Sequence, residues 1–370
     1  MLATACLPPP AKAAPNSPAP PDDLQTVRQR LLRSLLASAA PAAARHDAAT
    51  LSPDGSWPDV NYSDTTRTGG WSPHLHLDRT INMAACVRAA NGSGPAAALV
   101  PRTRSAIDYW LKTDPRSLNW WWNELQVPAR IADAALLFRP WIRTQHTLAV
   151  LSKFMERADY SKRTGANLDD EVATAIKRGV LFGNRSLVAA AFARLWEEIR
   201  VVQPSGCLDP PRGTQGCPTD GIQADSSFHQ HGPELLAGSY GEGFAAATLS
   251  SIALADGTAF APNASQAALF ASLLLDGMRW MTVGTPARWD WSVKGRDMGT
   301  VARRVELNVT LLSMSGREDE LAAFGAAIDG RQAPALLGHR GYWTSDYAVI
   351  RGTSVRLAWA PFALANLLAC

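Results

Sequence analysis

The chain has 370 residues, 46% of them hydrophobic and 19% charged, a globular composition that excludes an extended disordered chain. Its net charge of +3, without a basic run or a groove-reading motif, argues against a nucleic-acid-binding protein. No apolar stretch approaches the roughly 20 residues of a membrane span, so we expect no membrane partner.

Residues 1–22 are rich in alanine and proline and predict a disordered leader or the remnant of a targeting segment. Two features favour export to an extracellular compartment. The first is an excess of N-x-[ST] sequons, which predicts glycosylation, at Asn61, Asn91, Asn184, Asn263 and Asn308. The second is the pair Cys207 and Cys217, which flank a Pro/Gly-rich loop and could form a disulfide in an oxidising compartment.

Residues 23–335 show mostly helical spacing of apolar residues. One amphipathic helix is predicted from Leu24 to Leu36, with Asp22 and Asp23 as caps. Further helical stretches are predicted near 78–90, 101–112, 121–138, 144–157, 169–200, 234–255, 264–281 and 300–328. Successive helices with few strand signals between them predict a mainly α fold, a layered or toroidal array of helix pairs.

Residues 336–370 have a different character. After Gly338, aromatic and β-branched residues alternate between glycines, which predicts one or two β-strands. Two strands do not form a stable sheet alone. We therefore expect these strands either to pack on the helical domain or to begin a larger β-domain beyond Cys370.

Three segments carry side chains suited to chemistry. In the first, Asn119 and Glu124 bracket Trp120, Trp121 and Trp122. Successive helical residues are about 100° apart, so three consecutive tryptophans cannot all face one core, and at least one should be exposed. An exposed indole can stack on a sugar ring, although a Trp-rich corner of the core is the alternative.

The second segment runs from Arg163 to Asp170 and contains Thr164-Gly165-Ala166-Asn167. A simple helix start explains it, with glycine for the turn and a polar cap. The functional interpretation is that the amide of Asn167 donates a hydrogen bond to a substrate carboxylate.

The third segment runs from Asp225 to His231 and is followed nine residues later by Tyr240. A single histidine is usually structural. Here His229 and His231 lie in a polar loop next to glycine, and histidine and tyrosine can both transfer protons.

Together these segments resemble polysaccharide lyase family eight, which includes chondroitin AC, hyaluronan and xanthan lyases. The family's N-W-W-x-x-E-I-x-x-P, T-G-A-N and D-x-S-F-x-Q-H motifs are matched in order at 119–128, 164–167 and 225–231, with the catalytic tyrosine at Tyr240. A D-x-S-x-x-G-R element ends at Arg296, and His339 to Trp343 is similar to the entry into the family's β-sandwich. The resemblance covers residues 60–355. It departs at Thr300, where family members often have a second arginine, and the chain ends before the Glu or Asn that the family's β-domains contribute.

The resemblance implies an incomplete (α/α) toroid, the first strands of a truncated β-sandwich, and β-elimination on an acidic polysaccharide. Asn167, helped by His231, would neutralise the uronate carboxylate. Tyr240 would remove the C5 proton, and Arg296 would favour its phenolate. The resemblance implies substrate binding by Asn119, Trp120, Trp121, Trp122 and His229. It implies no metal or cofactor, and we expect a monomer.

Three alternatives stay open on the sequence alone. His231 could be the base instead of Tyr240. The chain could be an inactive carbohydrate-binding toroid that lacks its β-domain. It could also be a toroid glycoside hydrolase, which needs two carboxylates across a cleft, from Asp169, Asp170, Asp225, Glu234 and Glu242.

Overall fold

The computed structural model describes residues 22–67, 69–202, 219–295, 304–313, 315–332 and 335–352, and the backbone alone at 356–359. The helices are α1 (Asp23–Leu36), α2 (Pro41–Thr50), α3 (His74–Ala89), α4 (Leu99–Thr113), α5 (Val127–Phe138), α6 (Gln145–Met155), α7 (Gly165–Phe182), α8 (Arg185–Glu198), α9 (Glu242–Ala255), α10 (Ala264–Ser272) and α11 (Glu318–Ile328). Within the described ranges, no helix combines the length and the apolar character needed to cross a bilayer.

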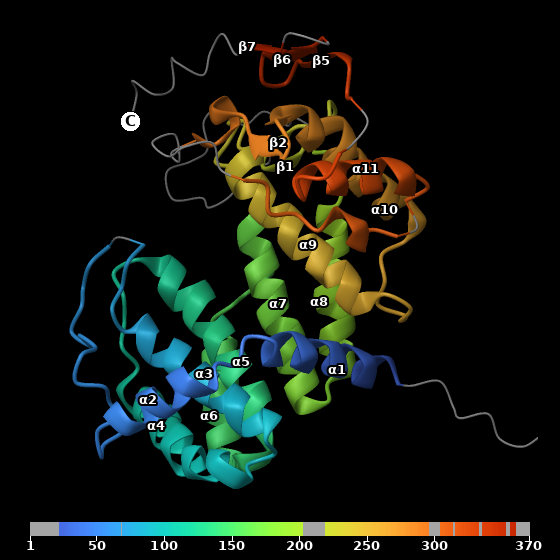
Figure 1. Cartoon of the computed structure of the whole chain (residues 1–370). Helices are drawn as coiled ribbons and strands as arrows, with labels where there is room; N and C mark the ends of the chain where they lie inside the picture. The colour runs from blue at the N-terminus through green and yellow to red at the C-terminus, as the bar shows by residue number, and fades with distance from the viewer. Residues whose placement is uncertain are drawn as a thin grey trace, which may run out of the picture.

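The helices pack as neighbouring pairs, which confirms the predicted mainly α architecture and gives an incomplete (α/α) toroid. Contacts join α3 to α5, α5 to α7, α7 to α8 and α7 to α9. Figure 1 shows α2 to α6 gathered in one group, α7 to α9 running side by side, and α1 crossing the lower ends of α7 and α8. Arg30 also ties α1 to the end of α9, because its guanidinium donates to the carbonyl oxygens of Leu254 (2.9 Å) and Asp256 (2.6 Å).

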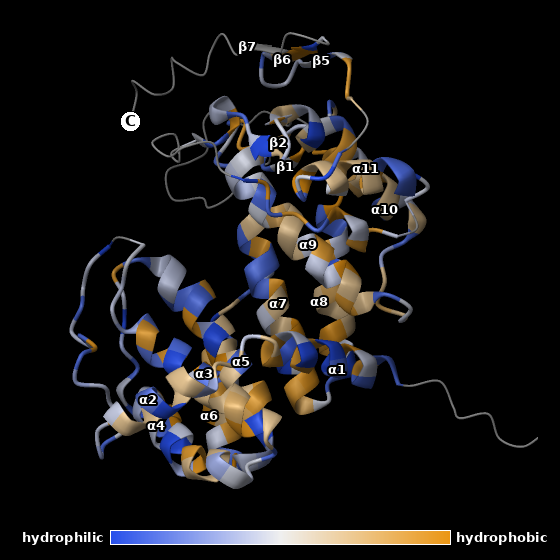
Figure 2. Ribbon diagram, in the orientation of Figure 1, coloured by the Kyte–Doolittle hydropathy of each residue, from blue (hydrophilic) through white to orange (hydrophobic). Residues whose placement is uncertain are grey.

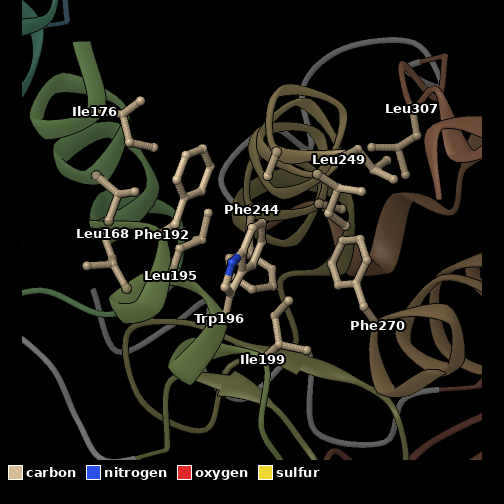
Figure 3. Packing of buried hydrophobic residues seen from close by; sticks show 14 of the residues in the cluster. Leu168, Ile176, Phe192, Leu195, Trp196, Ile199, Phe244, Leu249, Phe270 and Leu307 are labelled. Atoms are coloured by element: carbon tan, nitrogen blue, oxygen red, sulfur yellow. The ribbon is translucent and has the colours of Figure 1, made fainter. Parts of the chain in front are cut away.

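Two apolar clusters form the core. The larger cluster contains residues of α1 and of all the helices from α3 through α11, and the smaller one contains residues of α2, α3, α4 and the end of α5. Figure 3 shows the larger cluster where α7 and α8 meet α9 and α10, with the rings of Phe192, Trp196, Phe244 and Phe270 at its centre. In Figure 2 hydrophilic residues cover much of α1, whose buried positions are Val27 and Leu31. The apolar residues recur at helical spacing in the sequence because one face of each helix is buried in a core.

Several helix limits differ from the prediction. The stretch 169–200 is two helices, because Gly183 adopts a left-handed conformation (φ +68°) that ends α7 and Asn184 caps α8 by accepting from the Leu187 amide at 2.9 Å. Helix α2 is absent from the predicted set. The predicted helix near 300–328 is wrong in its first half as far as it is described, since α11 begins at Glu318 and residues 304–317 contain only the short turn Val309–Leu311.

The C-terminal segment forms one antiparallel sheet of three strands in the order β5 (Gly338–Tyr342), β6 (Tyr347–Arg351) and β7 (Arg356–Trp359), one more than the sequence predicts. The pairs β1 (Gly221–Ile222) with β2 (Phe228–His229), and β3 (Thr282–Val283) with β4 (Arg288–Trp289), are short hairpins. The larger sheet is attached to the helical part. The Tyr342 hydroxyl donates to the carbonyl oxygens of Asp276 and Gly277 (both 2.9 Å), and Arg351 donates to three carbonyl oxygens between Arg279 and Thr282.

Candidate active site

The turn that begins α7 lies directly against the loop that carries His231. The side-chain oxygen of Gln230 accepts from the Ala166 amide at 3.4 Å. Gly165 has φ +58°, and a Cβ at this position would lie 2.1 Å from the same Gln230 oxygen. Only glycine fits this close approach with this backbone conformation. Two of the predicted motifs, far apart in the sequence, are thus neighbours in the structure.

Asn167 lies in the first turn of α7 and is half-buried. Its side-chain amide makes no hydrogen bond with any residue in the described part of the chain. The backbone beneath it is held from α8, because Glu198 accepts from the Gly165 amide at 2.8 Å and also pairs with Arg194 at 3.0 Å. The turn is therefore fixed while the Asn167 amide keeps its donors for another partner.

His231 and Tyr240 contact each other edge to face, with ring centroids 4.7 Å apart and an interplanar angle of 90°. His231 is exposed and has a left-handed backbone (φ +63°), and Tyr240 is half-buried in the π-helical turn Ala237–Gly241 that leads into α9. This turn contacts α7, and a Cβ at Gly243, one residue into α9, would lie 3.9 Å from the Ala166 Cβ. The structure therefore places Asn167, His231 and Tyr240 on adjoining segments.

Asp220 binds both neighbours of His231 in the chain. Its carboxylate accepts from the Gln230 side-chain amide at 2.8 Å and from the Gly232 backbone amide at 3.0 Å. A left-handed conformation in a residue other than glycine costs of order 1–3 kcal/mol and persists only where its surroundings fix it. Burial raises the pKa of Asp220, whereas the Gly232 amide and the nearby His231 act to lower it. Nothing in the local sequence around Asp220 indicated this role.

The loop before His231 is attached to the C-terminal sheet. One oxygen of Asp225 accepts from the backbone amide (2.9 Å) and the hydroxyl (2.8 Å) of Thr344, and the other accepts from Ser227. Burial raises the pKa of Asp225, but the hydrogen bonds from Thr344 and Ser227 outweigh it and leave the pKa below its usual value. The turn between β5 and β6 therefore rests on the candidate site.

His229 is placed differently from the prediction. Its side chain is 2% exposed and its Nε2 lies 2.7 Å from the Ser345 hydroxyl under the β5–β6 turn, so it is out of reach of a substrate in this structure. Burial lowers its pKa to about 4, against an opposing effect of Asp225. His229 is thus a neutral, buried support for the loop.

The three tryptophans separate into two environments. Trp122 is 4% exposed and packs in the core, with the His74 ring at 5.0 Å and the Arg130 guanidinium at 5.3 Å, so its indole is not open to a substrate in this structure. Trp120 and Trp121 are half-buried, as the helical geometry predicts for at least one of the three. Asn119 is a local cap whose Oδ1 accepts from the Trp121 amide at 3.1 Å.

Arg163 connects the tryptophan segment to the α7 turn. Its guanidinium carbon lies 4.1 Å from the centre of the Trp120 ring, and the same group contacts the carboxylates of Glu124 and Glu171. The sequence marked Arg163 only as the first residue of a segment, because the contacts that define its role are long-range.

Arg296 lies outside the described residues. Its neighbour Gly295 (φ +58°) is described, and a Cβ there would lie 2.5 Å from Leu236, next to the turn that holds Tyr240. The D-x-S-x-x-G-R element therefore approaches the same region, and Asp290 closes its turn by accepting from the Ser292 amide (3.0 Å) and hydroxyl (2.6 Å).

The carboxylates required by the glycosidase alternative are not arranged as a pair of exposed groups. Asp169 and Glu242 are each 3% exposed, and Asp225 is occupied by Thr344 and Ser227. Burial raises the pKa of Asp169 well above its usual value, and the same effect raises that of Asp170. These buried carboxyl groups are not placed to act on a substrate from two sides of a cleft, so the structure does not support the glycoside hydrolase alternative.

Comparison with known proteins identifies the family and the fold. Residues 24–277 match polysaccharide lyase family 8, N-terminal alpha-helical domain. The chain is 27% identical over 318 residues to the chondroitinase-AC of Pedobacter heparinus, which covers 80% of this chain and 42% of that protein. Among solved structures, a chondroitinase AC lyase gives a TM-score of 0.77 at 23% identity, covering 91% of this chain and 50% of that one.

A Paenibacillus xanthan lyase gives a TM-score of 0.68 at 15% identity and covers 89% of this chain and 36% of its own. A mutant chondroitin AC lyase from Streptomyces coelicolor A3 gives 0.64 at 18% identity, covering 91% and 53%. The chain thus spans between 36% and 53% of the length of these relatives. These similarities show the fold, and the match over residues 24–277 shows that the chain belongs to polysaccharide lyase family 8.

Proposed function

We propose that this chain is the helical catalytic part of a polysaccharide lyase that cleaves uronate-containing acidic polysaccharide by β-elimination and leaves an unsaturated uronate end. One observation carries the proposal: Gln230 joins the Asn167 turn to the His231 loop, and the ring centroids of His231 and Tyr240 lie 4.7 Å apart. The residues named for charge neutralisation and for proton transfer therefore lie on segments that touch. The relatives named as chondroitinase AC and xanthan lyase support the substrate class.

In this reaction Tyr240 removes the proton from C5 of the uronate. The electrons of the C5–H bond form the C4–C5 double bond, the C4–O bond to the leaving sugar breaks, and the leaving oxygen takes up a proton. The C5 proton is only weakly acidic while the neighbouring carboxylate is charged, so Asn167 and His231 bind that carboxylate and stabilise the negative charge that develops. The exposed His231 remains the second candidate for the base.

The phenol of tyrosine has an ordinary pKa of about 10, so a nearby cation is needed to favour the phenolate. Arg296 is our candidate, because it follows Gly295, which packs beside the turn of Tyr240. Trp120 and Trp121 complete the proposed binding residues as stacking surfaces for sugar rings, and Asn119 orients them through its cap.

Tyr240→Phe tests this mechanism, because it removes only the hydroxyl and keeps the ring against His231. Turnover of chondroitin, hyaluronan or xanthan, followed by the ultraviolet absorbance of the new double bond, should be abolished while polymer binding persists, because the lost interaction is made only in the transition state. Asn167→Ala should also abolish turnover. His231→Ala should cost less than Tyr240→Phe if His231 assists, and as much if it is the base. Near-normal turnover of Tyr240→Phe would end the proposal.

We also propose that the protein is secreted and glycosylated, with a disulfide between Cys207 and Cys217. All five sequon asparagines are exposed, and Asn184 and Asn263 use only Oδ1 for helix capping, which leaves Nδ2 for a glycan. Cys207 and Cys217 lie outside the described residues, and Cys86 is a buried free thiol. Intact-mass measurement of the native protein, before and after reduction and deglycosylation, tests both modifications; an unmodified mass with free thiols at both positions would contradict them.

A further inference from the structure

Arg163 makes contacts that neither the family motifs nor the proposed mechanism explains. It precedes the T-G-A-N turn, and its side chain is only 9% exposed, so it is poorly placed to bind a substrate itself. Its guanidinium carbon lies 4.1 Å from the centre of the Trp120 ring, and the same group contacts Glu124, which lies 39 residues earlier in the tryptophan segment. Its Nε lies 3.4 Å from Glu171 on α7.

The backbone of Arg163 is held separately from its side chain. Its carbonyl oxygen accepts from Arg194 at 2.9 Å, and Arg194 pairs with Glu198, which accepts from the Gly165 amide at 2.8 Å. Loss of the guanidinium should therefore leave the α7 turn, and Asn167 on it, in place. The same loss would free the Trp120 ring to change its orientation.

We propose that Arg163 is a positioning residue that fixes the Trp120 ring beside the Asn167 turn and leaves only the opposite face of the ring for a sugar. A planar guanidinium stacks on an aromatic face and at the same time pairs with carboxylates, whereas an ammonium does so less well. Trp122 is buried in the core, and Trp121 meets it edge to face at 5.0 Å, so Trp120 is the ring whose orientation depends on Arg163. This inference rests on the proposed function, because it assigns a role in binding the same sugar chain.

The kinetic consequence follows from which interaction is lost. Stacking of a sugar on Trp120 is present in the bound substrate as well as in the transition state, so its loss raises KM and leaves kcat nearly unchanged. We expect Arg163→Lys to raise KM about tenfold with kcat within about threefold of the parent. Glu198→Gln, which loosens the Asn167 turn rather than the ring, should instead lower kcat.

Arg157 provides a matched control. It makes the same two kinds of contact, a double hydrogen bond to Asp114 (2.9 and 2.8 Å) and a stack over the Phe154 ring at 4.0 Å, but on the α4 and α6 side of the molecule. Arg157→Lys should cost similar stability and leave KM and kcat unchanged. Arg163→Lys keeps a positive charge near Glu171, whose pKa burial raises to about 8 against the opposing effect of Arg163.

The experiment has a readout that does not require turnover. The protein is labelled with 5-fluorotryptophan, and the Trp120 fluorine resonance is assigned by Trp120→Phe. Arg163→Lys should move or broaden that resonance, and Arg157→Lys should not. A Trp120 resonance that is unmoved, or a KM that matches the Arg157→Lys control, would overturn the positioning role. Absence of unsaturated product from the parent protein would instead refute the proposed function, and the resonance would still decide the role of Arg163.

Discussion

Gly165→Ala tests the contact between the Asn167 turn and the His231 loop. Alanine in the left-handed conformation that Gly165 adopts (φ +58°) costs roughly 1–2 kcal/mol. Its Cβ would also lie 2.1 Å from the Gln230 oxygen, so Gln230 must move and weaken its bonds to Ala166 and Asp220. Each such bond contributes about 1 kcal/mol, so we expect a total loss of about 2–4 kcal/mol in the free energy of unfolding.

Gly183→Ala is the matched control for this change. Gly183 has φ +68°, and an added Cβ there meets nothing within 4 Å, so this variant carries only the backbone cost of roughly 1–2 kcal/mol. Denaturant unfolding gives the free energy of unfolding of both variants, and the difference between the two losses is the cost of the clash with Gln230. Turnover should fall sharply in Gly165→Ala, because Gln230 adjoins His231, and remain near the parent value in Gly183→Ala. Equal losses of stability in the two variants would show that the approach to Gln230 is not tight.

Two further predictions concern stability. Burial lowers the pKa of both His229 and His76 to about 4, so between pH 6.5 and 4 the unfolded chain binds more protons than the folded one. The contribution of each neutral, buried histidine to the free energy of unfolding is therefore complete above about pH 6.5. It is lost towards pH 4 at about 1.4 kcal/mol per pH unit for each histidine. Thermal unfolding across this range should show the fall, and His229→Asn should reduce its slope; a slope unchanged by that variant would contradict the assignment. Thr344→Val removes the hydroxyl that donates to Asp225 at 2.8 Å and should cost about 1.5–3 kcal/mol with partial loss of turnover, whereas an unchanged midpoint of unfolding would show that this hydrogen bond does not hold the turn.

The sequence predicts most of the architecture because helical periodicity and capping are local properties. The limits of α1, to within one residue, and the end of α5 at Phe138 follow from them, whereas α5 begins at Val127, later than the predicted start at residue 121. The division of α7 from α8 was missed because the apolar spacing continues across Gly183, whose left-handed conformation only the structure reveals. Helix α2 was missed because it is rich in alanine and has only Ala44 and Ala48 buried, which gives a weak periodic signal.

The candidate site was predicted unevenly for the same reason. Asn167, His231 and Tyr240 lie in motifs with fixed internal spacing, so the sequence could name them, and the structure places them on touching segments; their chemical roles remain predictions. The supporting residues Asp220 and Glu198 act through hydrogen bonds over 10 to 33 positions, which no local pattern records. The burial of Trp122 and His229 likewise depends on partners elsewhere in the chain.

The contact between Asp225 and Thr344 has a consequence for how the molecule is made. It joins residues 119 positions apart, so the loop before His231 gains these hydrogen bonds only after the segment around Thr344 has left the ribosome. Pairing over such a separation carries a loop-closure entropy and comes late in folding. A nascent or proteolytically shortened chain that contains every helix up to α11 would therefore form its core before these hydrogen bonds fix the loop of His231, and the proposed site would be completed last.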